Sequence, residues 1–85
     1  MRYPRGVKIT VELQSYLDQY SPNGDDARVF SYELPDGATV RDLVRKLHIS
    51  SELASVIIVS DEPTDDTRAL TEGDRVTLIP PIAGG

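Results

Sequence analysis

The sequence predicts a single α+β domain, in which a mixed sheet of four to five strands packs on one main helix. Three observations lead to this prediction: segments of period-two alternation, one amphipathic helical segment between them, and clusters of turn-forming residues at the boundaries. A chain of 85 residues can form one small core, and we expect no second domain. The expected order is strand, strand, helix, strand, short element, strand.

The first two expected strands form a hairpin. Apolar and polar residues alternate strictly over 7–13, as is typical of a strand with one buried face. The same alternation recurs over 30–34, after a cluster of turn formers at 21–26. We expect the second strand to run antiparallel to the first, and residues 35–37, Pro-Asp-Gly, to close it with a turn.

The main helix is expected to begin at a capping box. Thr39 and Asp42 have its spacing, with Asp in place of the usual Glu or Gln. An apolar stripe at helical spacing follows, formed by Val40, Leu43, Val44 and Leu47. His48 and Ile49 mark the end of the helix. His48 is the only histidine, and we interpret it as a structural residue near the carbonyl end of the helix.

The second half of the chain is less regular. Residues 50–52 are expected to form a short helical turn. The run of β-branched residues at 56–59 predicts a strand covered on both faces rather than a sheet edge. Residues 60–67 are interpreted as an acidic loop.

The last strand completes the predicted sheet. The apolar pair Ala69 and Leu70 is too short to form more than an isolated β-bridge. Residues 72–74 are expected to form a turn. Val76 and Leu78 then alternate with polar residues, as expected of a strand. Ile79 is expected to point outward. A hairpin whose sheet wraps one diagonal helix is the β-grasp arrangement.

Composition excludes several classes of function. The chain has no cysteine, which removes thiolate zinc sites, iron–sulfur clusters and a cysteine nucleophile. The net charge of −5 disfavours nucleic acid as a partner. No long apolar run or secretory segment is present, so we expect no membrane partner and a cytoplasmic location. No P-loop, Rossmann or zinc motif is present, and the sequence does not predict an independent enzyme.

Two acidic pairs are candidates for metal or general-acid groups. Asp25-Asp26 and Asp65-Asp66 both lie among turn formers, where Asp side chains bind their own backbone. Neither pair has the spacing of an EF-hand loop. We interpret both as solvated turns and expect no metal site and no bound cofactor.

The most distinctive stretch is the end of the sequence, Pro80-Pro81-Ile82-Ala83-Gly84-Gly85. Two prolines stop a strand because neither donates a ladder hydrogen bond. The glycine pair has no Cβ, so it can enter a channel too narrow for other residues. We therefore expect a domain at 1–79 and a mobile tail at 80–85, with chemistry at the Gly85 carboxylate inside a partner's active site.

These residues resemble a known family. Residues 70–76, Leu-Thr-Glu-Gly-Asp-Arg-Val, followed by 78–85, Leu-Ile-Pro-Pro-Ile-Ala-Gly-Gly, are similar to the C-terminal signature of the MoaD/ThiS sulfur carriers. These carriers are ubiquitin-like β-grasp proteins. The motif of Gly-Asp before a strand, then Pro-Pro and Gly-Gly, covers about a fifth of the chain. The prolines favour the small subunit of molybdopterin synthase within the family.

The resemblance implies a two-stage chemistry at Gly85. A ubiquitin-activating-type enzyme adenylates its carboxylate with ATP, and sulfur then replaces AMP to give a thiocarboxylate. Gly84 and Gly85 enter both the activating enzyme and the large subunit of a sulfur-accepting synthase. The residues before them are expected to bind these partners through an apolar surface inferred from position, namely Ile79, Pro80, Pro81, Ile82 and Ala83.

Two segments depart from the family pattern, and several alternatives stay open. The acidic loop at 60–67 and the connection at 15–26 are longer than is common in the family. The carrier could serve thiamine thiazole, cysteine or tungsten-cofactor synthesis. A protein modifier joined through Gly85 to target lysines is a second class of function. An interaction module with a dispensable tail is a third.

Overall fold

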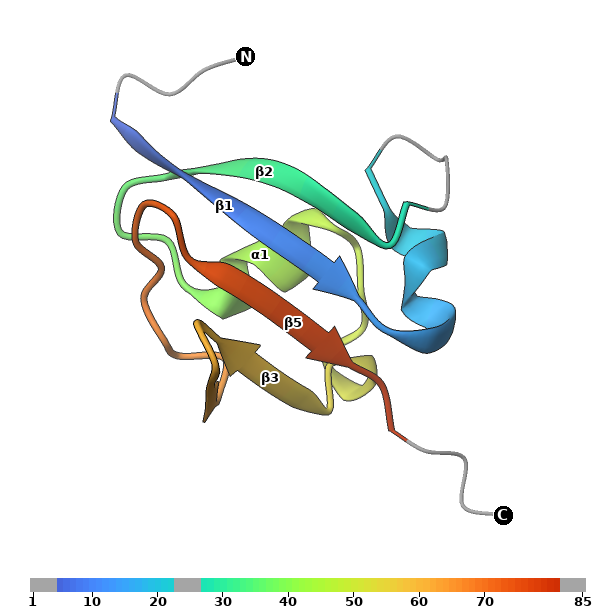
Figure 1. Cartoon of the computed structure of the whole chain (residues 1–85). Helices are drawn as coiled ribbons and strands as arrows, with labels where there is room; N and C mark the ends of the chain where they lie inside the picture. Colours follow the sequence, from blue (N-terminus) through green and yellow to red (C-terminus); the bar gives the residue numbers. More distant parts are fainter. Residues whose placement is uncertain (1–4, 23–26, 82–85) are drawn as a thin grey trace.

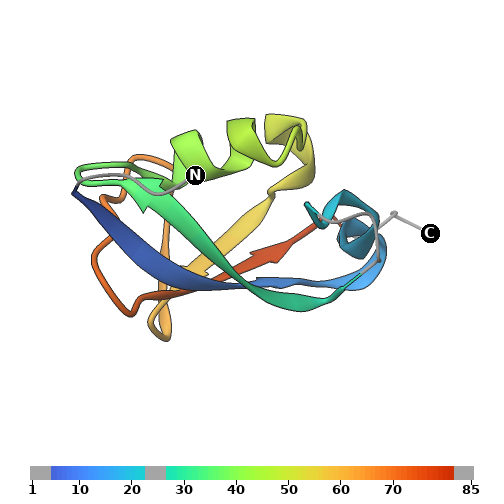
Figure 2. The ribbon, with the colours of Figure 1, turned by 90° about the horizontal axis from the view of Figure 1, so that it is seen from above.

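The computed structural model describes residues 5–22 and 27–81. Within these residues, five strands form one mixed sheet in the order β2-β1-β5-β3-β4, and helix α1 packs on one face of it (Figures 1 and 2). The α+β, β-grasp prediction is confirmed. The elements are β1 (Gly6–Leu13), the 3-10 helix η1 (Ser15–Tyr20), β2 (Val29–Pro35), α1 (Val40–Lys46), the 3-10 helix η2 (Ser51–Leu53), β3 (Val56–Val59), β4 (Glu62–Thr64) and β5 (Arg75–Ile79).

The predicted hairpin is confirmed. β1 and β2 pair antiparallel, with Val7 opposite Leu34 and Val11 opposite Phe30. Because residues opposite each other share a face of the sheet, the alternating apolar residues of both strands face α1. The predicted turn after β2 also forms, with the Ala38 N–H donating to the Pro35 carbonyl at 3.1 Å.

β5 is the central strand of the sheet. It runs parallel to β1, with Val11 opposite Val76 and Leu13 opposite Leu78, and antiparallel to β3 on its other side. Val11, Val76 and Leu78 are fully buried beneath α1. The core therefore lies between α1 and the inner face of β1 and β5, and the last strand is fixed by neighbours on both edges.

The ends of α1 follow from local chemistry. The capping box is present: the Asp42 N–H donates to Thr39 Oγ1 at 3.4 Å, and the Thr39 N–H donates to Asp42 Oδ2 at 2.9 Å. Leu43 and Val44 of the predicted stripe are buried against the sheet. His48 ends the helix in the left-handed region at φ 61°, and its N–H donates to the Arg45 carbonyl at 3.0 Å. This agrees with a structural role for His48.

β3 forms at the predicted position, but the prediction that both of its faces are covered is wrong. The strand lies between β5 and β4, so it is not a sheet edge. Ile57 and Val59 are buried against the core, but Val56 is 44% exposed and Ile58 is only partly buried. One face of β3 is therefore open, because α1 covers only the inner face of the sheet.

The segment interpreted as an acidic loop contains a strand. Ser60 and Asp61 both have positive φ, at 49° and 71°, which is the conformation of a two-residue hairpin turn. The chain then returns as β4, with Thr64 opposite Ile57 and Pro63 opposite Ile58. Pro63 is tolerated because β4 is the edge of the sheet.

The connection after β1 also has structure that the sequence analysis did not predict. η1 places Leu17 in the core with no exposed surface, and Ser21, which caps the end of η1, is also buried. A 3-10 helix of this length has too few turns to show a periodic pattern in sequence. The acidic pair Asp25-Asp26 lies outside the described residues.

Candidate functional site

The end of β5 is held on both sides by backbone hydrogen bonds. The Gln14 N–H donates to the Leu78 carbonyl at 3.0 Å, and the Ser55 N–H donates to the Ile79 carbonyl at 3.1 Å. Pro80 follows and is buried, whereas Pro81 is exposed. Neither proline can donate a ladder hydrogen bond. Residues up to Ile79 therefore form a fixed base for the segment that follows.

The predicted site residues divide into two groups. Ile79, Pro80 and Pro81 are described, and they lie together at the end of β5 (Figure 1). Pro80 presents little surface to a partner because it is buried. The remaining four, Ile82, Ala83, Gly84 and Gly85, lie outside the described residues. The roles assigned to all seven stay predictions.

An apolar patch lies on the outer face of the sheet beside this end of β5. Val56 is directly opposite Ile79, and Ile58 is opposite Thr77. Since alternate residues share a face, Val56, Ile58 and Ile79 lie on the face turned away from α1. We call these three residues the tail-proximal patch. Val56 is 44% exposed, and the other two are partly exposed.

Two of the three patch residues were missed in the sequence analysis. In a run of four β-branched residues, inward and outward positions look alike, so Val56 and Ile58 could not be told from core residues. The register with β5 separates them. The strict alternation of β5, with Val76 and Leu78 inward, was the one signal that placed Ile79 outward.

A charged pair borders the patch on the β1 side. Arg75 Nη2 and Glu12 Oε1 form an ion pair across β1 and β5, and Gln14 donates to the other carboxylate oxygen of Glu12. Glu12 is opposite Thr77, which is in turn opposite Ile58. The outer face therefore changes from charged at β1 to apolar at β3.

The Gly-Asp motif before β5 has a structural role. Gly73 has φ 86°, a conformation that favours glycine. Asp74 Oδ2 accepts from the Thr71 N–H at 2.9 Å, and Asp74 Oδ1 accepts from Ser60 Oγ at 2.9 Å. Burial raises the pKa of Asp74, but the hydrogen bonds from Thr71 and Ser60 outweigh it, and the pKa lies below its ordinary value. The motif thus fixes the start of β5 against the β3–β4 turn.

The second acidic pair is also structural. Asp65 Oδ1 accepts from the Thr67 N–H at 3.0 Å, as expected of a turn residue. Asp66 instead pairs with Arg41 of α1 at 3.2 Å. In the part of the chain that the structure describes, no cluster of His, Cys, Asp and Glu side chains could hold a metal ion.

The sequence matches a known family. Residues 23–85, well over half of the chain, match the ThiS family, and the protein belongs to this family of small ubiquitin-like sulfur carriers and modifiers. Members of the family work with ubiquitin-activating-type enzymes and with partner subunits, and they are not typical enzymes. No curated protein sequence gives a significant match.

Solved structures give the same fold. A Haloferax volcanii protein known in solution has a TM-score of 0.78 at 20% identity, over 100% of this chain and 92% of its own. A Pyrococcus furiosus protein provisionally assigned as molybdopterin converting factor, subunit 1, has a TM-score of 0.69 at 26% identity, over 89% and 99%. The small archaeal modifier protein 1 of Methanosarcina acetivorans has 0.68 at 13% identity, over 95% and 99%.

The helices of the described residues are all short. In residues 5–22 and 27–81, none is long and apolar enough to span a membrane.

Proposed function

We propose that the protein is a sulfur carrier for molybdopterin synthesis, working in the cytoplasm, with Gly85 as the residue that carries sulfur. The observation that carries this proposal is the ThiS family match, which extends through residue 85 and so includes the Gly-Gly pair. The similarity to the Pyrococcus furiosus protein supports the molybdopterin pathway. Synthesis of thiamine thiazole or another sulfur compound is the alternative within the carrier class.

The proposed reaction has two steps. A carboxylate oxygen of Gly85 attacks the α-phosphorus of ATP, the bond to pyrophosphate breaks, and an acyl adenylate forms. Hydrosulfide then attacks the carbonyl carbon, the bond to AMP breaks, and the thiocarboxylic acid so formed loses its proton to solvent. The product is the Gly85 thiocarboxylate. The activating enzyme supplies the ATP site, and this chain supplies the carboxylate.

The described residues support the proposal through position. β5 is hydrogen bonded on both sides to its last residue, so a partner that holds the domain also fixes the point from which residues 80–85 continue. The tail-proximal patch lies beside that point and offers an apolar surface to the activating enzyme and to the synthase large subunit. Ile79 belongs to that patch, the exposed Pro81 extends the contact beyond the end of β5, and Gly84 and Gly85 enter the partner's active site.

A protein modifier is the second candidate, and the structural likeness to small archaeal modifier proteins favours it. The first step is the same. A lysine ε-amine of a target then attacks the acyl adenylate in place of hydrosulfide, or attacks a thioester derived from it, and an isopeptide bond forms. The two candidates therefore differ in the group that accepts Gly85.

Intact mass spectrometry separates the candidates. The protein is incubated with ATP, sulfide and a lysate of its native host, beside a variant that lacks Gly85. Replacement of one oxygen by sulfur at Gly85, absent from the variant, supports the carrier. An isopeptide-linked conjugate supports the modifier, and an unchanged mass with an active lysate contradicts both. Molybdopterin formation from the sulfur-loaded protein and a synthase large subunit then tests the pathway.

A further inference from the structure

Pro80 is buried although it lies one residue beyond the end of β5. Val76 and Leu78 are buried along β5, the residue after each is only partly buried, and Pro80 continues this alternation. A residue that precedes a proline adopts an extended backbone, so the alternation of faces carries on through Pro80. The Pro80 ring therefore lies on the core side of the sheet, whereas Pro81 is exposed.

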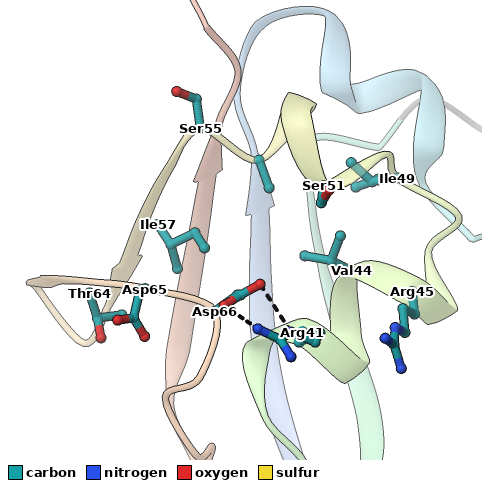
Figure 3. A pocket seen from close by; sticks show the side chains of 11 residues that line it. Arg41, Val44, Arg45, Ile49, Ser51, Ser55, Ile57, Thr64, Asp65 and Asp66 are labelled. Carbon is teal, nitrogen blue, oxygen red and sulfur yellow. Dashed lines mark hydrogen bonds and ion pairs between the residues drawn. The ribbon is translucent and has the colours of Figure 1, made fainter.

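Two backbone hydrogen bonds fix the residues just before Pro80. The Gln14 N–H donates to the Leu78 carbonyl at 3.0 Å, and the Ser55 N–H donates to the Ile79 carbonyl at 3.1 Å. Gln14 is the residue before η1, and Ser55 lies between η2 and β3, beside the end of β5 (Figure 3). The chain therefore reaches Pro80 with a hydrogen-bonded neighbour on each side.

A proline suits this buried position because it has no N–H. β1 and β5 pair in parallel, and in that pattern a donor at residue 80 would reach the Gln14 carbonyl. The Gln14 carbonyl already accepts from the Leu17 N–H at 3.1 Å, where η1 begins. Since Pro80 lacks a donor, its burial leaves no N–H without a partner. The start of η1 and the end of β5 are therefore matched to each other at Pro80.

We propose that Pro80 is a positioning residue: held by the domain, it sets the direction in which residues 81–85 continue and so orients the Gly85 carboxylate in the activating enzyme. This inference rests on the proposed function, in which Gly85 reacts. Pro80 acts through the chain and does not touch the reacting atoms. Its buried ring and fixed φ remove backbone freedom that would otherwise be lost each time Gly85 enters the active site. Such orientation accelerates the chemical step.

Hydrogen exchange of the full chain tests whether the domain holds Pro80, and it needs no partner. Pro80→Gly removes the buried ring and the fixed φ. We expect the Ser55 amide to exchange about tenfold faster, because its acceptor, the Ile79 carbonyl, becomes free to move. Pro63→Gly makes the same substitution at an exposed residue of β4, which is separated from β5 by β3, and is expected to leave this amide unchanged. The buried Val11 reports on the stability of the core.

Kinetics of adenylation test the positioning role. The host's activating enzyme is incubated with ATP, labelled pyrophosphate and each variant, and the label that enters ATP is measured. Pro80→Gly is expected to lower kcat by about tenfold and to change KM by less than about threefold, because the tail-proximal patch still binds while the freed residues must be ordered within the complex. Val56→Lys is expected to act mainly on KM, since it alters the patch. Pro63→Gly is expected to change neither constant.

The remaining outcomes overturn the proposal. Unchanged exchange of the Ser55 amide in Pro80→Gly would show that Pro80 does not hold the end of β5, and faster exchange that includes Val11 would assign the effect to general stability. A normal kcat despite faster Ser55 exchange would show that Gly85 is oriented by other means. A loss in KM alone would make Pro80 a docking contact. If the original protein exchanges no pyrophosphate, the proposed function itself fails, and the positioning role fails with it.

Discussion

Val56 and Ile79 lie directly opposite each other on β3 and β5, on the face of the sheet turned away from α1. Val56 is 44% exposed although it adjoins the end of the central strand. We predict that Val56→Lys weakens binding to the activating enzyme by about tenfold, because a charge enters an apolar contact. The free energy of unfolding is expected to change by less than about 0.5 kcal/mol. Isothermal calorimetry and urea denaturation measure the two effects.

Val29 gives a matched control for this experiment. It is 49% exposed and, opposite Glu12, it lies on the same face of the sheet, but on β2 and three strands from β3. Val29→Lys is expected to leave the affinity unchanged. Equal losses in the two variants would show that the net charge of the chain, and not the tail-proximal patch, governs binding.

The capping box of α1 gives a stability prediction. Thr39→Ala removes the acceptor of the Asp42 N–H and is expected to lower the free energy of unfolding by about 1 kcal/mol. Thr39→Ser keeps a hydroxyl and is expected to recover most of the loss. Urea denaturation of the three proteins checks this, and equal stability of the Ala and Ser variants would contradict it.

Gly73 gives a backbone prediction. Its φ of 86° is unfavourable for any side chain, while a Cβ added there would meet no atom within 4 Å. Gly73→Ala is therefore expected to destabilise by about 1 kcal/mol through backbone strain alone. His48→Gly, at φ 61°, is expected to act in the opposite direction. Thermal unfolding compares the variants, and a stable Gly73→Ala protein would exclude strain at this turn.

The acid stability of the fold follows from Asp74. Because its pKa is lowered in the folded state, the carboxylate stabilises the fold above the ordinary Asp pKa of about 3.9, and this contribution is lost as the pH falls through the folded-state pKa. Asp42 and Asp65 have lowered pKa values from their hydrogen bonds with Thr39 and Thr67, and they act in the same direction.

The Asp74→Asn variant isolates this contribution. It is expected to be less stable than the original protein at pH 7 and to approach it in stability as the pH falls from 7 through the folded-state pKa of Asp74, where the carboxylate becomes protonated. Urea denaturation across this range measures the difference. A difference that stays constant with pH would assign the loss to packing rather than to the charge of Asp74.

Much of the fold could be predicted because its signals are local. The alternation of β1 states which side chains face the core, and Thr39 with Asp42 specifies where α1 begins. The resemblance carried by the Gly-Asp, Pro-Pro and Gly-Gly motif agrees with the family match. The candidate site was predicted only in part. The outward position of Ile79 could be predicted from the alternation in β5. The outward position of Val56 could not, because every residue of the run is β-branched and the pattern does not distinguish the buried face from the exposed one.

By itself, the sequence determined the elements whose periodicity, caps and turns lie within a few residues of each other: β1, β2, α1 and β5. The tertiary structure decided what depends on pairing between distant segments. The antiparallel register of β3 with β5 brought Val56 beside Ile79, and α1 packed over only one face, so that Val56 stayed exposed. The Arg41–Asp66 pair, 25 residues apart in the chain, joined α1 to the segment that follows β4. Such contacts follow from the packing of whole elements around a shared core, and local patterns in a sequence do not record them.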